Sequence, residues 1–352
     1  MRTPRIALPL CLVLLPLAVE AAQPVELPAV RLIATGGTIS SRPGGRLTAA
    51  ELVALVPALD RHVRAETEQF SNLPSSELTV TAWLALARRV NRLLDERPAL
   101  SGIVVTSGTD TLEEVAYFLH LTVRHTRPVV VVGAMRPPGT LGYDGAANLL
   151  HAFRVAAAPA SVGRGVLVVL NAEIHSARDV TKANAQGLDA FGSREYGRLG
   201  VVGHDRVLYY GRTDRRHTWR SEFDVSAIDR LPRVDVLLAY QGAPGDLIVA
   251  AAARGAAGVV VAASGAGSMS PSQLDATRLV LRRGVAVVVA SRTGGGRVVP
   301  RPGTGPRKRR LPAPPRRVMG EDLSPVKARV LLMLALTHTR EQAEIQRMFQ
   351  EY

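Results

Sequence analysis

The 352-residue sequence has one cysteine, two tryptophans and an aromatic content of only 4%. The single thiol, Cys11, lies in an apolar N-terminal stretch. One cysteine can form neither an intrachain disulfide nor a thiolate zinc site, so a disulfide scaffold and a zinc finger are both excluded. The fold must rest on a hydrophobic core, for which 47% hydrophobic residues is ample at this length.

Several catalytic signatures are also absent. The sequence has no Walker-type phosphate loop, no HExxH zinc motif and no Gly-x-Ser-x-Gly elbow, and its histidines show no ligand spacing. A glycine-rich turn at residues 264–267 follows an apolar run but lacks the rest of a nucleotide-binding fingerprint. We therefore expect no metal and no cofactor. A Ser-His-Asp set built from distant residues stays open at this point.

Lysine is scarce although the chain is basic. The formal net charge is +14, and the only lysines are Lys182, Lys308 and Lys327, so arginine supplies most of the positive charge. The densest basic stretch, residues 301–317, is rich in proline and glycine and has no aromatic side chains for base stacking. We interpret it as a solvated loop and expect no nucleic-acid partner. A patch that binds acidic surfaces is the alternative.

The first 21 residues have the pattern of an export signal. Arg2 and Arg5 precede an apolar run over residues 6–19, and small residues follow at 21 and 22. The run is too short to span a bilayer as a helix, which disfavours a retained anchor. We predict that residues 1–21 are a signal peptide and that the protein is periplasmic or secreted, with no membrane association after cleavage.

Apolar, β-branched runs predict strands at residues 30–34, 102–106, 128–135, 165–171, 234–239, 258–263 and 284–290. Helical patterns lie between several of these runs, and such alternation is typical of a doubly wound parallel sheet. The pattern changes between residues 192 and 232. We predict an α/β fold in which a doubly wound, mostly parallel N-terminal domain spans 22–214, a linker spans 215–232 and a smaller α/β C-terminal domain spans 233–352.

Shorter patterns predict individual helices and one hairpin. Apolar residues at helical spacing over 80–94 predict one helix. Thr111 and Glu114 have the spacing of a capping box at the start of the next helix. Ser324 followed by Pro325 predicts the N-cap of a C-terminal helix. The runs 201–204 and 207–210 predict a hairpin that turns at Asp205.

Two hydroxyl-rich turns carry most of the functional information. The turn ATGGT at 34–38 follows one predicted strand, and TSGTDT at 106–111 follows another. The carboxyl ends of parallel strands share an edge of the sheet, where open α/β sheets bind ligands. Glycine lets the backbone approach a substrate, and a threonine hydroxyl becomes a nucleophile once a base takes its proton. The two turns therefore suggest one site on two strands, with Thr38 as a candidate nucleophile.

These turns and several further blocks resemble the bacterial L-asparaginase/glutaminase family: PVVVVGAMRP at 128–137, GYDGAANL at 142–149, RDVTKAN at 178–184 and ARVLLMLALT at 328–337. The resemblance extends from about Val30 to Tyr352. It implies an amidohydrolase that converts L-asparagine to L-aspartate and ammonia through a threonine acyl-enzyme, with glutamine as a second candidate substrate. It also implies a homotetramer in which paired subunits build each site, and no cofactor.

The resemblance further assigns roles to individual positions. Thr38 matches the nucleophilic threonine, and the family's second catalytic group matches Thr109, Asp110 and Lys182. The substrate-binding residues correspond to Ser75, Ser76, Glu77, Thr109 and Asp110, of which Asp110 would pair with the α-ammonium group. Lys182 also stands out on its own, because it is the only lysine before residue 308 and, unlike arginine, a lysine can give up a proton.

The sequence also departs from the family pattern. Residues 40–47 hold no tyrosine where the family's mobile loop carries one, and the stretch 292–297 is basic where a partner-subunit glutamate is expected. The intersubunit asparagine is missing from 240–246, and Ser107 stands where histidine is frequent. These departures predict a low kcat. They leave two alternatives: a non-catalytic amino-acid-binding relative, and an asparaginase-like subunit of a tRNA-dependent amidotransferase, against which the predicted export signal argues.

Overall fold

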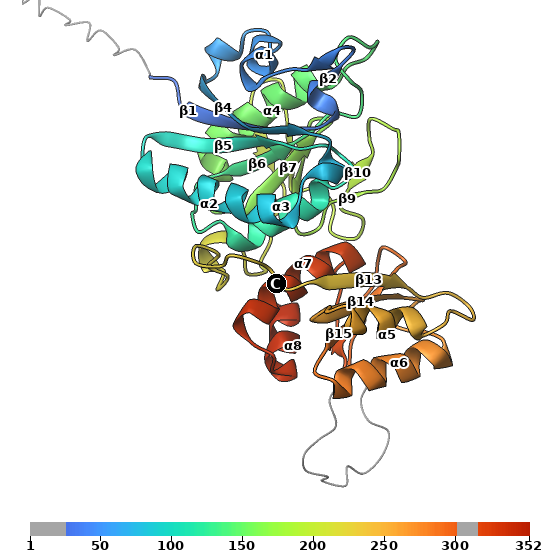
Figure 1. Cartoon of the computed structure of the whole chain (residues 1–352). Helices are drawn as coiled ribbons and strands as arrows, with labels where there is room; N and C mark the ends of the chain where they lie inside the picture. Colours follow the sequence, from blue (N-terminus) through green and yellow to red (C-terminus); the bar gives the residue numbers. More distant parts are fainter. Residues whose placement is uncertain (1–25, 301–315) are drawn as a thin grey trace, which may run out of the picture.

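The structure, a computed structural model, describes residues 26–300 and 316–352 (Figure 1). The predicted signal peptide, with Cys11, and residues 301–315 of the basic stretch lie outside the described residues. No helix in the described part of the chain is long and apolar enough to cross a membrane.

The larger domain is built on an eight-stranded sheet. Its strands, in spatial order, are β12 (Val207–Tyr209), β11 (Gly200–Val202), β8 (Glu173–Ser176), β7 (Val166–Leu170), β6 (Val129–Val132), β5 (Leu100–Thr106), β1 (Ala29–Gly36) and β4 (Arg64–Leu73). The strands from β7 to β4 are parallel, and β8, β11 and β12 add an antiparallel margin that includes the predicted hairpin. The predicted doubly wound, mostly parallel sheet is therefore confirmed.

Helices cover both faces of this sheet (Figure 1). One face packs against α2 (Val80–Glu96) and α3 (Leu112–Thr122), and the other packs against α1 (Ala49–Ala54) and α4 (Gly145–Ala157). Consecutive residues of β1 show the division, because Leu32 belongs to the core under α1 and α4 while Ile33 belongs to the core under α2 and α3. Two short ribbons lie near the carboxyl edge: β2 (Ser41–Arg42) with β3 (Gly45–Arg46), and β9 (Thr181–Lys182) with β10 (Phe191–Gly192).

The smaller domain has a four-stranded parallel sheet in the order β13 (Val234–Leu238), β14 (Gly258–Ala263), β15 (Ala286–Ser291) and β16 (Val318–Met319). Its helices are α5 (Asp246–Ala253), α6 (Pro271–Arg282), α7 (Pro325–His338) and α8 (Gln342–Glu351). Ser324 caps α7 and Pro325 is its first residue, as the sequence predicts. This arrangement confirms the predicted smaller α/β C-terminal unit.

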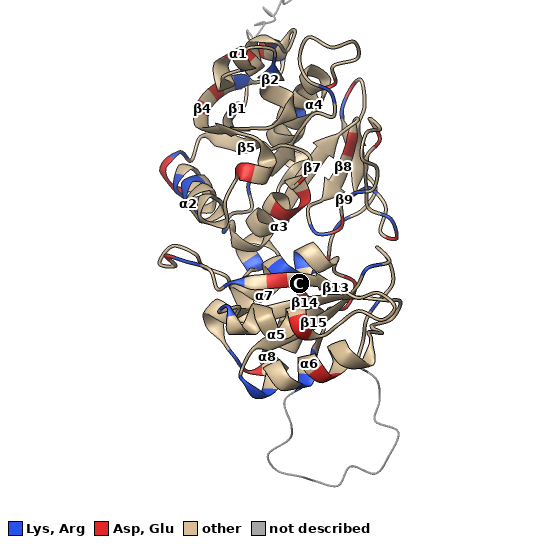
Figure 2. Ribbon diagram, turned by 45° about the vertical axis from the view of Figure 1, so that its right-hand side comes forward, with Lys and Arg blue, Asp and Glu red and all other residues tan. Residues whose placement is uncertain are grey.

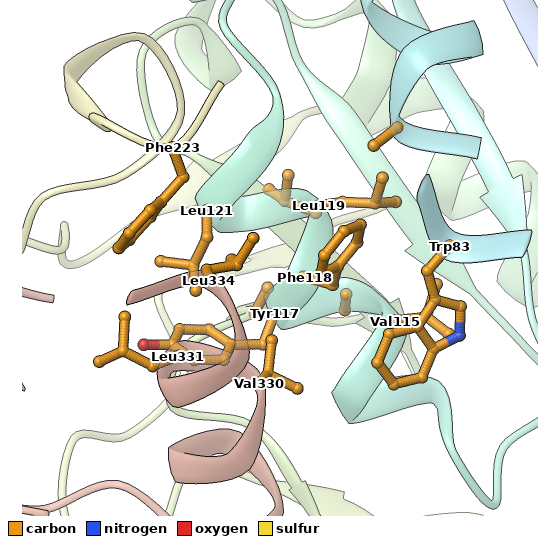
Figure 3. Packing of buried hydrophobic residues seen from close by; sticks show 14 of the residues in the cluster. Trp83, Val115, Tyr117, Phe118, Leu119, Leu121, Phe223, Val330, Leu331 and Leu334 are labelled. Atoms are coloured by element: carbon orange, nitrogen blue, oxygen red, sulfur yellow. The ribbon is translucent and has the colours of Figure 1, made fainter. Parts of the chain in front are cut away.

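Helix α7 joins the two domains through one continuous core. Figure 3 shows Tyr117 and Leu121 of α3 facing Leu331 and Leu334 of α7. The same cluster of buried residues includes Val260 in the sheet of the smaller domain. Because apolar surface is removed from water on both sides of α7, separation of the domains would expose it. The relative position of the domains is thus fixed by hydrophobic packing.

The predicted capping box at Thr111 and Glu114 is wrong. The Thr111 side chain does not cap α3; its hydroxyl donates instead to the backbone oxygen of Ser75, at 3.2 Å. Glu114 is half-buried and pairs with Arg329 of α7 at 3.2 Å. Figure 2 shows acidic residues of α3 and basic residues of α7 on the two sides of the domain boundary. Tertiary partners have therefore replaced a local motif.

A buried charged group completes the domain boundary. The Arg178 guanidinium donates to both carboxylate oxygens of Asp322, at 3.1 and 2.7 Å, and its Nε donates to the Tyr352 oxygen at 2.5 Å. Both side chains of the ion pair are only 3% exposed. Burial by itself would raise the pKa of the Asp322 carboxyl, but hydrogen bonds and charge from Arg178 hold it well below its ordinary value.

Replacing Asp322→Asn should lower the free energy of unfolding at pH 7 by about 3–5 kcal/mol, because it leaves Arg178 buried without its main carboxylate. Since the folded-state pKa lies below the unfolded one, the wild-type contribution is present above about pH 4 and is lost as the pH falls through the folded-state value. Urea unfolding at pH 7 and at pH 3 measures both effects. Asp275→Asn, in an exposed pair, is the control and should cost less than about 1 kcal/mol. A loss in Asp322→Asn that is equal at both pH values would contradict this account.

Candidate active site

The first predicted turn lies where β1 ends. Gly36 and Gly37 have φ angles of 111° and 89°, and Thr38 begins a short 3-10 turn, Thr38–Ser40. A Cβ on Gly37 would stand 2.4 Å from the Cα of Gly108, which belongs to the second predicted turn. The two turns therefore touch backbone to backbone, at a distance that only glycine permits. Thr38 is half-buried beside this contact.

The second turn follows β5, the strand next to β1. The two strand ends are tied together, since the Thr35 amide donates to the Thr106 hydroxyl at 3.1 Å and the Thr35 hydroxyl donates to the Thr106 oxygen at 2.6 Å. Thr109 is buried, whereas Asp110 is exposed. The structure thus places both turns at one edge of the sheet, as the sequence analysis expects from parallel strands.

A third segment reaches the same place from the end of β4. Gly37 donates its backbone N–H to the Leu73 oxygen at 2.9 Å. A Cβ on Gly108 would stand 2.7 Å from the Cβ of Ser75, so Ser75 lies directly against the second turn. Ser76 and Glu77 continue the same short turn and are exposed. Of the three residues predicted for this loop, Ser75 therefore contacts the Gly108 turn.

Lys182 comes from the ribbon β9–β10 and completes the cluster. Its Nζ donates to the Thr109 hydroxyl at 3.0 Å and to the Asp110 carboxylate at 2.6 Å. The Lys182 side chain is 15% exposed and that of Asp110 is 77% exposed, so the carboxylate of this ion pair is open to solvent while the lysine is mostly covered. Residues far apart in sequence are brought together here, and a hydroxyl, an amine and a carboxylate form one hydrogen-bonded group.

Two residues that the sequence analysis did not select hold Lys182 in place. Glu113 of α3 accepts hydrogen bonds from the Thr181 hydroxyl at 3.0 Å and from the Lys182 backbone N–H at 3.4 Å. Lys327 of α7 donates to the backbone oxygens of Arg178, at 2.7 Å, and Val180. Burial lowers the pKa of Lys327 to about 8. The scarcity of lysine, used above for Lys182, would have marked Lys327 as well.

The segment after Thr38 forms the β2–β3 hairpin. Arg46 donates from Nη1 to the Gly37 oxygen at 3.0 Å, and the exposed Arg42 pairs with Glu51 at 3.0 Å. A tyrosine does reach this turn, but from another loop: the Tyr143 hydroxyl donates to the Ile39 oxygen at 3.0 Å. Burial raises the pKa of Tyr143 to about 12, so at neutral pH it is a hydrogen-bond donor. No signal in the sequence connected residue 143 with residue 39.

The chemistry of the cluster fits a small polar substrate. Within residues 26–300 and 316–352 no group of three or more His, Cys, Asp or Glu side chains could hold a metal ion. What the edge of the sheet offers is a half-buried hydroxyl on a glycine turn, a buried hydroxyl in contact with an amine, and an exposed carboxylate. Such groups can attack a carbonyl carbon, move a proton and bind an ammonium group.

The chain is similar to known proteins over nearly its whole length. Residues 29–215 match the family model "Asparaginase, N-terminal", and residues 233–349 match "Glutaminase/Asparaginase C-terminal domain". The chain is 40% identical over 343 residues to "L-asparaginase 2" of Bacillus subtilis, covering 95% of this chain and 89% of the relative. It is 36% identical to "Glutaminase-asparaginase" of Pseudomonas fluorescens, covering 97% and 96%. A solved structure of a "Probable Cytoplasmic L-asparaginase" from Campylobacter jejuni superposes with a TM-score of 0.85 at 38% identity, covering 92% and 100%.

Substitution Gly37→Ala should displace the Thr38 turn, because a Cβ at φ 89° would meet the Gly108 backbone at 2.4 Å. Backbone strain and overpacking together predict a loss of roughly 2–5 kcal/mol and of most catalytic turnover. Gly44→Ala is a matched control, since Gly44 has φ 79° but nothing within 4 Å of the added Cβ. Thermal unfolding and an ammonia assay compare the two variants. Equal activities would show that the glycine contact does not position Thr38.

Proposed function

Because this chain belongs to the asparaginase family, we propose that it is an amidohydrolase that converts L-asparagine to L-aspartate and ammonia. The observation that supports this most directly is the contact of Lys182 with Thr109 at the edge of the sheet that carries Thr38. The resemblance on which the sequence analysis relies is confirmed by the family matches over both domains.

In the proposed reaction Thr38 is the nucleophile. Its Oγ1 attacks the side-chain amide carbon, the hydroxyl proton leaves, and the amide nitrogen takes up a proton and departs as ammonia. We assign the stabilisation of the oxyanion that develops on the carbonyl oxygen to the Thr38 backbone N–H, because the Gly37 N–H is already bonded to the Leu73 oxygen. Water then attacks the acyl-enzyme, and Thr38 recovers its proton as the product carboxylate is released.

Thr109, Lys182 and Asp110 supply the proton transfers and part of the binding. The 3.0 Å contact between the Lys182 Nζ and the Thr109 hydroxyl gives a short route for a proton, with Thr109 the inner member of the pair. The exposed Asp110 carboxylate is available to the α-ammonium group of the substrate. Ser75, together with Ser76 and Glu77, completes the proposed binding set.

Glutamine is a second proposed substrate. The relative from Pseudomonas fluorescens is named for both activities and covers nearly the whole chain. The two substrates differ by one methylene group, and a pocket discriminates such a pair by only about 1–3 kcal/mol. Parallel kcat/KM measurements on asparagine and glutamine decide the preference.

Calorimetry tests the non-catalytic alternative. Binding of asparagine without release of ammonia would support that alternative.

Export and assembly are also part of the proposal. The N-terminal pattern supports a periplasmic or secreted protein, whereas the related structure from Campylobacter jejuni is named cytoplasmic. Cell fractionation with N-terminal sequencing of the recovered protein locates it and shows whether residues 1–21 are removed. Light scattering of the purified protein tests the proposed homotetramer.

Thr38→Ala should abolish turnover while the fold is kept, because it removes a hydroxyl and a methyl group without opening a large cavity. Loss of a true nucleophile costs several orders of magnitude in kcat. Thr38→Ser is the matched variant, since it keeps the hydroxyl and should retain measurable activity. If pure Thr38→Ala released ammonia at more than about a tenth of the wild-type rate, the nucleophile would be another residue.

Lys182→Arg should be nearly as damaging as Lys182→Met, with kcat lowered by about 100-fold or more in both, because only lysine can become neutral and relay a proton. Both replacements keep a long side chain, so the comparison isolates proton transfer from charge. Steady-state kinetics give the values, and Arg206→Lys, at an exposed pair, controls for the exchange itself. Near-normal activity of the arginine variant would show that residue 182 contributes positive charge only.

A further inference from the structure

We propose that Arg46 is a positioning residue for the reaction, acting on the peptide group between Gly37 and Thr38. The proposal rests on the assignment of Thr38 as the nucleophile. It explains how the Thr38 hydroxyl can be activated although residues 40–47 contain no tyrosine.

Three donors converge on one carbonyl oxygen. The Gly37 oxygen accepts from the Arg46 guanidinium at 3.0 Å, from the Ser40 hydroxyl at 3.1 Å and from the Ser40 backbone N–H at 3.2 Å. That carbonyl belongs to the same peptide group as the Thr38 N–H. Hydrogen bonds to the oxygen draw electron density from the nitrogen and make the N–H a stronger donor, and a charged donor does so most strongly.

The charge on Arg46 is directed to this turn. Its neighbour in the hairpin, Arg42, is neutralised by Glu51, whereas among the described residues Arg46 takes part in no ion pair. Arg46 is also the less exposed of the two. A guanidinium one peptide group away from Thr38 favours the negative charge that develops there when the hydroxyl loses its proton and the oxyanion forms.

Tyr143 holds the opposite side of the turn and has a different role. Its hydroxyl donates to the Ile39 oxygen at 3.0 Å, and the peptide group polarised by that bond belongs to residues 39 and 40, beyond Thr38. Since burial raises the pKa of Tyr143 to about 12, it does not act as a base near neutral pH. Tyr143 therefore stabilises the turn and leaves the activating contact to Arg46.

The test compares substitutions at the two arginines of the hairpin. Arg46→Met should lower kcat by about 10–100-fold, with KM changed by less than about 3-fold and little change in melting temperature, because the loss falls on the transition state. Arg46→Lys, which restores a cation, should recover a large part of the lost kcat. Arg42→Met should keep the wild-type kcat, and Tyr143→Phe should lower the melting temperature more than the kcat.

A wild-type kcat in Arg46→Met would overturn the proposal, and so would a loss in Arg46→Lys equal to that in Arg46→Met. A change confined to KM would also overturn it, because that would indicate a substrate-binding arginine. Thr38→Ala measured beside these variants distinguishes a failure of the Arg46 proposal from a failure of the nucleophile assignment. If Thr38→Ala is inactive while Arg46→Met is normal, only the role of Arg46 fails. If Thr38→Ala is active, the proposed nucleophile fails first.

Discussion

The site depends on the contact between two glycines. Gly37 and Gly108 follow neighbouring parallel strands. A Cβ on Gly37 would stand 2.4 Å from the Gly108 backbone, and a Cβ on Gly108 would stand 2.7 Å from the Ser75 Cβ and 3.1 Å from the Gly37 Cα. The strands are held side by side by their apolar residues and by the reciprocal hydrogen bonds of Thr35 and Thr106. Ser75, which follows the end of β4, packs against this pair of glycines. The hydroxyls that follow each glycine are thereby fixed relative to each other without any direct bond between them.

Lys182 is held by a different part of the molecule. The ribbon that carries it is bonded to Glu113 of α3. Lys327 of α7 donates to the backbone oxygens of Arg178 and Val180, in the segment that leads into the ribbon. The smaller domain thus contributes to the position of Lys182 through α7. Its hydrophobic contact with α3 fixes where α7 lies, and α7 in turn fixes the segment that ends in Lys182. A continuous core across the domain boundary is consistent with a site that requires both domains in one fixed arrangement.

Much of the fold could be predicted from the sequence, because buried parallel strands are continuous apolar runs and the Ser324–Pro325 start of α7 is a local signal. Strand β4 was not predicted: it lies at the edge of the sheet, and its sequence RAETEQFSNL is mostly polar. The capping box predicted at Thr111 and Glu114 does not form, because both side chains bond to partners distant in sequence. Of the candidate site, the Thr109–Lys182 pair was accessible through the family resemblance. Glu113, Arg46 and Tyr143 were not, since their partners depend on how the loops meet in space.

The buried arginine at the domain boundary also has a consequence for the order of synthesis. The partners of Arg178, Asp322 and Tyr352, follow it by 144 and 174 residues. At a translation rate of about 5–20 residues per second, these partners are made roughly 7–35 s after the arginine itself. During that interval Asp179, the next residue in the chain and 2.9 Å from the Arg178 guanidinium, is the carboxylate partner that the arginine already has. The buried charge network at the domain boundary is therefore completed only when the segment around α7 and α8 has been made.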